Sequence, residues 1–232
     1  MKASYFDQHG GPDVLKYGDR PDPVAGPGDV VVDIHASTVN GADWRVREGG
    51  YGPQKLPHIC GRDFSGVVSA VGEGVTDLKV GDAVFAVMPA GQEGTYAEKV
   101  AVKAAVVAKK PDGLSHVDAA ALALIGLTAI NSVDDTLKLK KGETILIQGG
   151  AGGVASFAIQ FAKSVGAKVI STTSTGNVDY VKSLGADQVI DYKTDDFTRL
   201  GQTVDCVFET VGGETAAKSY SVLKPGGRAA FI

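Results

Sequence analysis

The chain shows two different rhythms of hydrophobic and polar positions, which change near residue 120. In the first part, short apolar runs are separated by turns rich in Gly, Pro and Asp. These runs predict strands at residues 30–36, 64–71, 83–87, 96–100 and 105–107. Many short strands with frequent turns are typical of an antiparallel, barrel-like domain.

After residue 120, strand-like apolar runs alternate with helix-like segments. The pattern predicts strands at residues 144–148, 168–172, 188–191, 204–208 and 228–232, and helices at residues 154–165, 177–184 and 215–223. Such alternation predicts a doubly wound parallel sheet. The sequence therefore predicts an α/β protein with two domains, residues 1–122 and 123–232.

Composition is that of an ordered protein, with 44% hydrophobic and 22% charged residues. The chain has 23 basic and 27 acidic residues, a formal net charge of −4, and no long basic run, so a nucleic-acid partner is not expected. Glycine stands out with 31 of 232 residues. This is about 13% of the chain, whereas about 7% is usual. This abundance indicates many tight turns and close backbone approaches.

Two cysteines, Cys60 and Cys206, cannot build a disulfide framework or a Cys-rich zinc site. One bridge between them is conceivable, but two buried thiols in a reducing compartment are favoured. The N-terminal segment lacks the apolar region of a secretory signal. The longest apolar stretch, residues 119–130, is too short to span a bilayer. We therefore expect a soluble, cytoplasmic protein with no membrane partner.

A glycine-rich turn follows the first predicted strand of the second domain. It contains Gly150-x-Gly152-x-x-Ala155, the spacing of a dinucleotide-binding turn between a strand and a helix. We expect Gly150 to permit the tight turn, Gly152 to admit the pyrophosphate, and Ala155 to let the helix approach the sheet. The helix N-terminus at Gly153 and Val154 then faces the phosphates. The alternative is a purely structural turn; a Walker loop is excluded because no Gly-Lys-Ser/Thr follows.

The residues after the next strand distinguish the two nicotinamide cofactors. NAD sites place an Asp or Glu about 20 residues past the first glycine, whereas this chain has no acid there before Asp179. Hydroxyl and amide groups, from Ser174, Asn177 and Tyr192, are candidates to bind the extra phosphate of NADP, and Lys182 is a further neighbour. The pattern favours NADP; alternatively, these groups only cap the next helix.

The segment from residue 142 to 163 resembles the signature of the quinone oxidoreductases, the zinc-independent, zeta-crystallin-like branch of the medium-chain dehydrogenase/reductases. It reads Gly-Glu-x-x-Leu, then Gly-Ala-Gly-Gly, then Gln-x-x-Lys, with Ala155 where the family normally has glycine. Further similar segments are residues 10–15, 39–43, 56–66, 126–129 and 183–187. The resemblance covers essentially the whole chain.

This resemblance implies a GroES-like catalytic domain followed by a Rossmann domain that binds NADPH. It implies that Asn40 and Thr128 lie near the nicotinamide and that Ser174 and Tyr192 lie near the 2′-phosphate. Tyr51 matches a tyrosine of the substrate cleft in relatives. From the residues alone, Asn40 could simply cap a turn and Tyr51 could be an ordinary loop aromatic.

Zinc chemistry is not expected. Zinc-dependent relatives carry a Cys and a His-Glu pair where this chain has Asn40 and Arg62-Asp63. The four histidines, His9, His35, His58 and His116, show no short ligand spacing. No metal site is therefore predicted.

Without zinc, the chemistry that remains is hydride delivery from NADPH to a carbon that is already electrophilic. Quinones and α,β-unsaturated carbonyls meet this condition, with Asn40 and Tyr51 as candidate catalytic residues and Tyr51 or water as the proton donor. Two alternatives compete: a non-enzymatic NADPH-binding protein (a sensor, adaptor or structural protein) and an inactive fragment.

The end of the chain carries a further expectation. The last predicted strand stops at Ile232, whereas the family has another Rossmann strand and a segment that returns to the catalytic domain. Family members are usually homodimers that pair through the strand that follows. We therefore expect a C-terminally truncated chain that lacks this dimer, is less stable than a full-length relative, and turns over substrate poorly.

Overall fold

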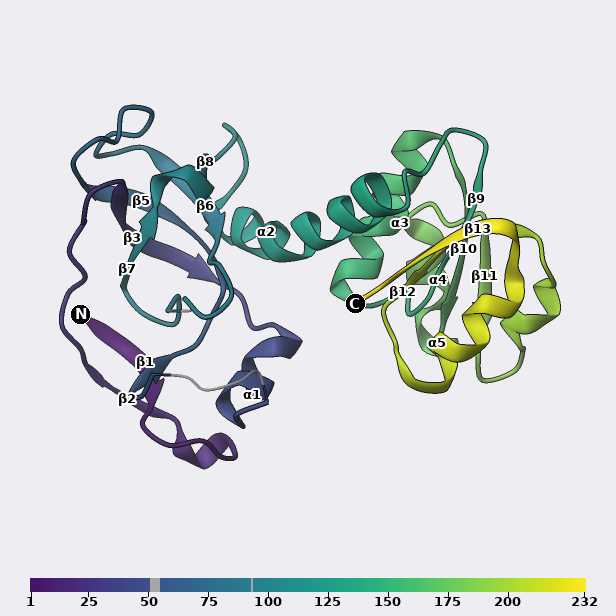
Figure 1. The fold of residues 1–232 in the computed structure, drawn as a ribbon, viewed down its shortest axis with the longest axis horizontal. Helices are drawn as coiled ribbons and strands as arrows, with labels where there is room; N and C mark the ends of the chain where they lie inside the picture. The colour runs from purple at the N-terminus through teal and green to yellow at the C-terminus, as the bar shows by residue number, and fades with distance from the viewer. Residues whose placement is uncertain (51–54, 93) are drawn as a thin grey trace. The chain divides into compact units, whose positions relative to one another are not determined.

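The computed structural model describes residues 1–50, 55–92 and 94–232. They form two compact units, Met1–Leu124 (unit 1) and Ile125–Ile232 (unit 2). The change from one to the other falls within helix α2 (His116–Ile130), which is labelled in Figure 1. The sequence pattern places the domain boundary between residues 122 and 123.

Unit 1 is built on a five-stranded antiparallel sheet of order β7-β3-β5-β6-β8. Its strands are β3 (Asp29–Ser37), β5 (Asp63–Val71), β6 (Ala83–Val87), β7 (Lys99–Lys103) and β8 (Val107–Lys109). Alternate side chains such as Val30, Val32, Phe64 and Val68 are buried in one core cluster. This alternation is the pattern that the apolar runs of the sequence predict.

A second, three-stranded sheet has the order β2-β1-β4. It consists of β1 (Lys2–Phe6), β2 (Lys16–Asp19) and β4 (His58–Ile59), with short helix α1 (Gly41–Arg47) and 3₁₀ turns at Pro12–Val14 and Ala104–Val106. The hydrophobic pattern predicts neither this sheet nor α1, because these elements are short and mostly polar. Together the two sheets give the GroES-like organisation of unit 1.

Two predicted strands of unit 1 are displaced along the chain. The strand expected at residues 96–100 begins at Lys99, because Tyr96 instead exchanges backbone hydrogen bonds with Cys60 and Ser4 outside the ladder. The strand expected at residues 105–107 begins only at Val107, because the residues before it form a 3₁₀ turn. The first run contains the charged residues Glu98 and Lys99, and Ala97 forms an isolated bridge with Ala3 of β1. In the second run, a local 3₁₀ turn overrides the strand pattern.

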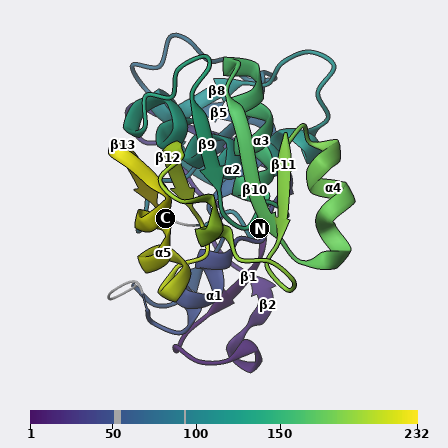
Figure 2. The same ribbon diagram turned by 90° about the vertical axis from the view of Figure 1, so that its right-hand side faces the viewer.

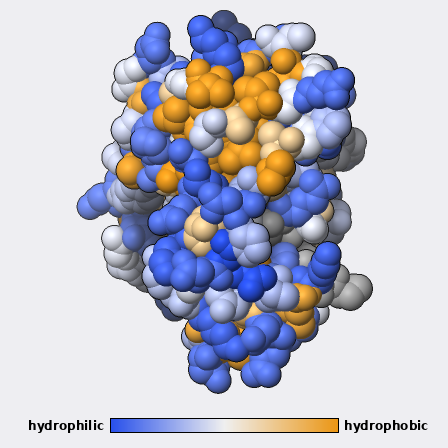
Figure 3. Space-filling view, turned by 90° about the vertical axis from the view of Figure 1, so that its left-hand side faces the viewer, coloured by the Kyte–Doolittle hydropathy of each residue, from blue (hydrophilic) through white to orange (hydrophobic). Residues whose placement is uncertain are grey.

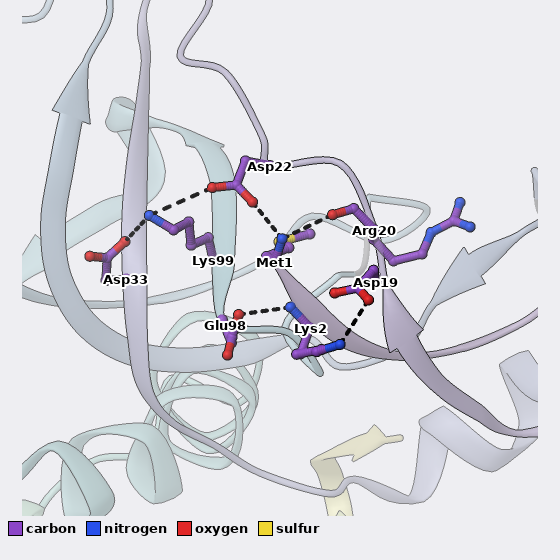
Figure 4. Close-up of polar contacts among 8 residues, drawn as sticks. All are labelled: Met1, Lys2, Asp19, Arg20, Asp22, Asp33, Glu98 and Lys99. Carbon is purple, nitrogen blue, oxygen red and sulfur yellow. Dashed lines mark hydrogen bonds and ion pairs between the residues drawn. The ribbon is translucent and has the colours of Figure 1, made fainter.

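Ion pairs connect the N-terminus to neighbouring segments of unit 1 (Figure 4). The Met1 amine donates to the Asp22 carboxylate and, at 3.0 Å, to the Arg20 carbonyl oxygen. Lys99 Nζ lies 3.2 Å from Asp33 Oδ1 and 3.8 Å from Asp22 Oδ2. Exposed pairs of this kind contribute only about 0–1 kcal/mol each, so their main effect is to fix the path of the chain.

Unit 1 also has apolar surface. Figure 3 shows hydrophobic side chains gathered over part of one face of the molecule. Large apolar side chains that unit 1 exposes include Val24 (84%) and Val80 (62%). Gathered surface of this kind is common at sites of contact with other chain segments or molecules.

Unit 2 is a five-stranded parallel sheet of order β11-β10-β9-β12-β13, seen side by side in Figure 2. Its strands are β9 (Thr144–Ile147), β10 (Lys168–Thr173), β11 (Gln188–Asp191), β12 (Val204–Glu209) and β13 (Leu223–Phe231). Its helices are α3 (Gly153–Val165), α4 (Val178–Ser183) and α5 (Gly213–Ser219). Short 3₁₀ turns lie at Thr175–Asn177, Phe197–Leu200 and Tyr220–Val222. Separate core clusters, one around Ile159 and one around Leu146, cover the sheet. Unit 2 is therefore the doubly wound Rossmann sheet that the sequence predicts.

The C-terminal helix is shorter than predicted. A helix at residues 215–223 was expected, but α5 ends at Ser219, a 3₁₀ turn follows, and Leu223 already pairs with Val204 of β12. The register then jumps, and Arg228 pairs with Cys206. The sequence between Leu223 and Arg228 is Lys-Pro-Gly-Gly, which bulges out of the ladder.

Helix α2 is longer than the apolar stretch that it contains. α2 continues into a π-helical turn at Asn131–Thr136, so that the helical segment His116–Thr136 has 21 residues and a hydropathy of 1.4. By length and composition it could cross a bilayer, so the expectation that this stretch is too short was wrong. The apolar run stops at polar residues while the helical backbone continues through them. Core helices of soluble proteins meet the same criterion, and 39% of the segment's most apolar window is buried.

Candidate functional site

A cavity of about 470 Å³ lies in unit 2, where strands of the sheet end. Its lining residues are Gln148, Gly149, Ala151, Thr172, Thr173, Ser174, Asn177, Tyr192, Phe197, Val211 and Thr215. Most of them follow the carboxyl ends of β9, β10, β11 and β12. The strand order reverses between β9 and β12, and ligands of such sheets bind in the crevice at this switch point. The volume suits a small molecule or part of a cofactor.

The glycine-rich turn connects β9 to α3 beside this cavity. Gly149 has φ +68°, a left-handed conformation that favours glycine. Its N–H donates to Thr172 Oγ1 at 3.1 Å, and the Gly150 N–H donates to the Thr172 carbonyl oxygen at 2.8 Å. The left-handed residue of the turn is Gly149, whereas Gly150 has no positive φ. Gly150 is required for packing, since a Cβ there would lie 2.2 Å from Ser171 Oγ.

The start of α3 has the features of a phosphate site. Gly152 is the N-cap, and a Cβ on it would meet only the Gly149 carbonyl oxygen, at 3.3 Å. Gly153 and Val154 follow in the first turn, whose N–H groups have no partner within a helix. Ala155 is 1% exposed and packs in the core of the sheet. A diphosphate fits here, because the missing side chain at Gly152 leaves the helix N-terminus approachable.

Three candidate residues for the 2′-phosphate, Ser174, Asn177 and Tyr192, line the same cavity. Asn177 Nδ2 donates to Ser174 Oγ at 3.1 Å. Neither Ser174 nor Asn177 caps a helix through its side chain, although each occupies an N-cap position. The capping alternative is thus not what the structure shows. No carboxylate lines this part of the cavity among the described residues.

Two lysines follow β10 and β11 along the chain, Lys182 within α4 and Lys193 directly after Tyr192. Lys193 Nζ lies 5.3 Å from the centre of the Tyr192 ring. Lys182, named from the sequence, is exposed and lies 4.0 Å from the Asp179 carboxylate, and it is not among the residues that line the cavity. The cavity end is therefore formed by neutral donors with a cation close to one of them.

Other lining residues were missed by the motif reading. Gln148 and Gly149 precede the glycine motif and Ala151 lies within it, whereas Val211 and Thr215 follow β12. The rule that ligands bind beyond the carboxyl ends of the strands at a switch point would have pointed to the second group. The glycine motif alone does not reach them.

Asn40 belongs to a polar cluster in unit 1. Its amide Nδ2 donates to Thr38 Oγ1 and to Asp63 Oδ1, both at 3.1 Å, and its backbone N–H donates to Asp43 Oδ2 at 2.7 Å. Thr38 Oγ1 donates to Asp63 at 2.6–2.7 Å. Burial raises the pKa of Asp63, while the hydrogen bonds from Thr38 and Asn40 oppose that rise.

These residues do not fit a zinc site. An amide nitrogen and a guanidinium are not zinc ligands, and Arg62 Nη2 donates to the Met88 carbonyl oxygen at 3.2 Å. The Asp63 carboxylate is occupied by Thr38 and Asn40. Within residues 1–50, 55–92 and 94–232 no three His, Cys, Asp or Glu side chains form a group that could hold a metal.

The remaining candidate residues are more scattered. Two histidines that are far apart in sequence, His35 and His116, have ring centres 4.5 Å apart in unit 1. Cys60 in unit 1 and Cys206 in unit 2 are both buried and form no disulfide. Thr128 lies on α2 and is half-buried, outside the cavity lining. Tyr51 lies outside the described residues.

Comparison with known proteins identifies the family. The family pattern described as "Alcohol dehydrogenase GroES-like domain" matches residues 26–112, and "Zinc-binding dehydrogenase" matches residues 153–232. The chain is 40% identical to a 2-methylene-furan-3-one reductase from Solanum lycopersicum, over 98% of this chain and 61% of that protein. It is 34% identical to a chloroplast envelope quinone oxidoreductase homolog from Arabidopsis thaliana, over 92% of this chain and 69% of that protein.

Solved structures agree. The quinone oxidoreductase from Coxiella burnetii is 34% identical, with a TM-score of 0.93 over 100% of this chain and 82% of that one. The Escherichia coli quinone oxidoreductase, solved with NADPH, is 33% identical with a TM-score of 0.91, over 98% and 71% of the two chains. The chain therefore belongs to the quinone oxidoreductase family of the medium-chain dehydrogenase/reductases. It spans about three fifths to two thirds of the length of several curated relatives.

Proposed function

We propose that this chain acts as an NADPH-dependent oxidoreductase that delivers hydride to a quinone or an α,β-unsaturated carbonyl compound. The observation that carries the proposal is the cavity of unit 2. There, the glycine-rich turn and a carboxylate-free group of Ser174, Asn177 and Tyr192 face one space. Relatives named quinone oxidoreductase and NADPH-dependent alkenal/one oxidoreductase support it.

Different residues of unit 2 would bind different parts of NADPH. The N–H groups of Gly153 and Val154 at the start of α3 would hold the diphosphate, and the missing side chain at Gly152 keeps the approach free. Ser174, Asn177 and Tyr192 would donate hydrogen bonds to the 2′-phosphate. When bound, NADPH supplies the hydride.

The acceptor has to be electrophilic by itself. Asn40, Arg62 and Asp63 do not fit the metal that would polarise a simple ketone, so we propose a zinc-independent reaction on conjugated carbonyls. Asn40 and Tyr51 remain the proposed catalytic residues, and Thr128 remains a proposed neighbour of the nicotinamide. Their part would be to orient the acceptor and to donate hydrogen bonds or a proton to the oxygen that gains charge.

The turnover assay is the direct test of this function. NADPH oxidation is followed with a panel of quinones and enones, and measurable turnover of at least one of them is expected. Tight NADPH binding without turnover of any acceptor would instead favour the non-enzymatic alternative or an inactive fragment.

The cofactor preference gives the first specific prediction. The unaltered chain should bind NADPH at least about tenfold more tightly than NADH, as two or three extra hydrogen bonds to a charged phosphate would provide. Ser174→Asp should reverse this order, because a carboxylate would repel the 2′-phosphate. Fluorescence titration of both cofactors measures the dissociation constants.

The control is Ser221→Asp, which adds the same charge at an exposed position of the 3₁₀ turn before β13. This variant should keep the preference for NADPH. Equal affinity of the unaltered chain for the two cofactors would contradict the assignment.

A second prediction concerns metal removal. After treatment with a chelator and extensive dialysis, the protein should retain all of its NADPH-dependent activity, because the residues at the zinc positions are engaged in other contacts. Activity and zinc content are measured before and after treatment. Stoichiometric zinc whose removal abolishes activity would refute a zinc-independent reaction.

We also make proposals about the partners, the assembly and the location of this chain. A small quinone or enone is the proposed substrate, with no nucleic acid or membrane as a partner. A homodimer is usual in the family, and this chain spans only part of the length of its relatives. We propose a cytoplasmic location, although some relatives are named as mitochondrial or chloroplastic.

A further inference from the structure

Two buried polar side chains stand at the ends of the central strands of unit 2. Gln148 directly follows β9 and is fully buried, and Glu209 is the last residue of β12 and is 1% exposed. These strands flank the point where the strand order reverses. Because buried polar groups are costly without partners, both side chains need a defined hydrogen-bond network.

Ser219 of α5 connects the two side chains. Gln148 Nε2 donates to Ser219 Oγ at 3.1 Å, and that oxygen lies 3.1 Å from Glu209 Oε2 and 2.8 Å from the Thr215 carbonyl oxygen. Ser219 is itself 1% exposed. The link therefore spans the switch point out of contact with solvent.

The network reaches the walls of the cavity on both sides. On one side, Thr172 Oγ1 donates to Gln148 Oε1 at 2.6 Å and accepts from the Gly149 N–H at 3.1 Å. On the other side, Glu209 Oε1 accepts from the N–H groups of Val211 at 2.6 Å and Gly212 at 3.0 Å.

Glu209 closes the turn that follows β12. Two successive N–H groups, those of Val211 and Gly212, meet one carboxylate oxygen of Glu209, and Gly212 then takes a left-handed conformation with φ +83°. Val211 and Thr215, on either side of Gly212, line the cavity, whereas Glu209 itself is absent from the lining. The carboxylate thus shapes the wall from behind.

We propose that Glu209 is a positioning residue for the cofactor. Through its bonds to Val211, Gly212 and Ser219 it holds the 210–212 turn against the glycine-rich turn, so that the crevice for the dinucleotide is formed before binding. Preorganisation of this kind raises affinity, because the ligand does not have to order the loop. The inference rests on the proposed NADPH-binding function.

The principal test compares Glu209→Ala with Asp205→Ala. Both changes remove a β12 carboxylate that accepts a backbone N–H, since Asp205 Oδ2 accepts from Thr144 N at 2.9 Å, but Asp205 lies toward the opposite end of the strand. Glu209→Ala should weaken NADPH binding by about tenfold or more, the effect of one charged hydrogen bond. Asp205→Ala should change it less than about twofold, even where both variants lose similar thermal stability.

A second measurement does not depend on the cofactor. Amide hydrogen exchange of the unliganded chain, followed by mass spectrometry, should be faster across residues 210–215 in Glu209→Ala and unchanged there in Asp205→Ala. Glu209→Gln, unlike Glu209→Ala, should keep both the affinity for NADPH and the protection of residues 210–215 from exchange. Its amide oxygen can accept from Val211 and Gly212, and its NH₂ group can donate to Ser219 Oγ.

Ser219→Ala keeps the contacts of Glu209 with the turn and removes the link to Gln148, so it remains informative if Glu209→Ala does not fold. It should weaken NADPH binding by a smaller factor than Glu209→Ala, and by more than Asp205→Ala. Unchanged affinity and unchanged exchange in Glu209→Ala, or equal effects of Glu209→Ala and Asp205→Ala, would overturn the positioning role. Failure of the unaltered chain to bind NADPH would contradict the proposed function, and the exchange data would still decide whether Glu209 orders the turn.

Discussion

Replacing Gly152 with valine is expected to abolish NADPH binding while unit 2 stays folded. The backbone at Gly152, with φ −73° and ψ 154°, is one that valine adopts readily. A Cβ there would meet only the Gly149 carbonyl oxygen, at 3.3 Å, so the protein itself nearly accommodates a side chain. The branched side chain would instead occupy the space in front of the first turn of α3. We expect a loss of affinity of at least about 100-fold, or about 2.7 kcal/mol.

Fluorescence titration with NADPH, together with circular dichroism, checks this expectation. The matched control is Gly18→Val in β2, where a Cβ would make only ordinary contacts, 3.8 Å from the Tyr5 ring. That variant should bind NADPH like the unaltered chain. If Gly152→Val retains its affinity, the glycine-rich turn is structural and the diphosphate does not bind there.

Much of unit 2 could be predicted because its sequence signals are local. The buried run at β9, the glycine spacing and the amphipathic α3 follow one another directly, so the strand, turn and helix were predicted within one or two residues. Ser174, Asn177 and Tyr192 were named from the missing acid and the hydroxyl groups, and they line one cavity. Their role in binding phosphate stays a prediction.

Other features depend on contacts that no local pattern carries. In the glycine-rich turn, Gly149 is left-handed and Gly150 is not. Both residues are glycines, so the sequence does not distinguish them. Val211 and Thr215 reach the cavity because β12 lies next to β9 in the sheet, although about 60 residues separate these two strands along the chain. Tertiary pairing, which the sequence pattern does not contain, determines both outcomes.

Unit 1 shows the same limit at a polar site. The sequence marks Asn40 and Asp63 only as separate positions at which relatives bind zinc. The structure joins them through Thr38, with Asn40 Nδ2 3.1 Å from Asp63 Oδ1. β3 and β5 are paired, and Ser37 lies opposite Phe64, so the residues that follow one strand and begin the other meet. The partner Thr38 could have been named only from this register.

Replacing Gly150 with alanine is expected to destabilise unit 2, in contrast to the change at Gly152. A Cβ at Gly150 would lie 2.2 Å from Ser171 Oγ and 3.1 Å from Val181 Cγ1, well inside contact distance. Ser171 cannot turn away freely, because its hydroxyl donates to the Ile147 carbonyl oxygen at 2.8 Å and the residue is fully buried. Overpacking of this kind costs about 1–3 kcal/mol, which we expect as a decrease in the free energy of unfolding.

The double variant Gly150→Ala/Ser171→Ala shows whether this clash is the cause. Ser171→Ala alone should cost about 1 kcal/mol through its lost hydrogen bond, but it also removes the atom that a Cβ at residue 150 would strike. The combined loss should therefore fall short of the sum of the single losses by about 1 kcal/mol. Hydrogen exchange of the β9 and β10 amides gives these free energies for unit 2 separately. The control is Gly176→Ala, where a Cβ would have open space, and it should leave these free energies unchanged. Strictly additive losses in the double variant would show that Gly150 is required for a reason other than contact with Ser171.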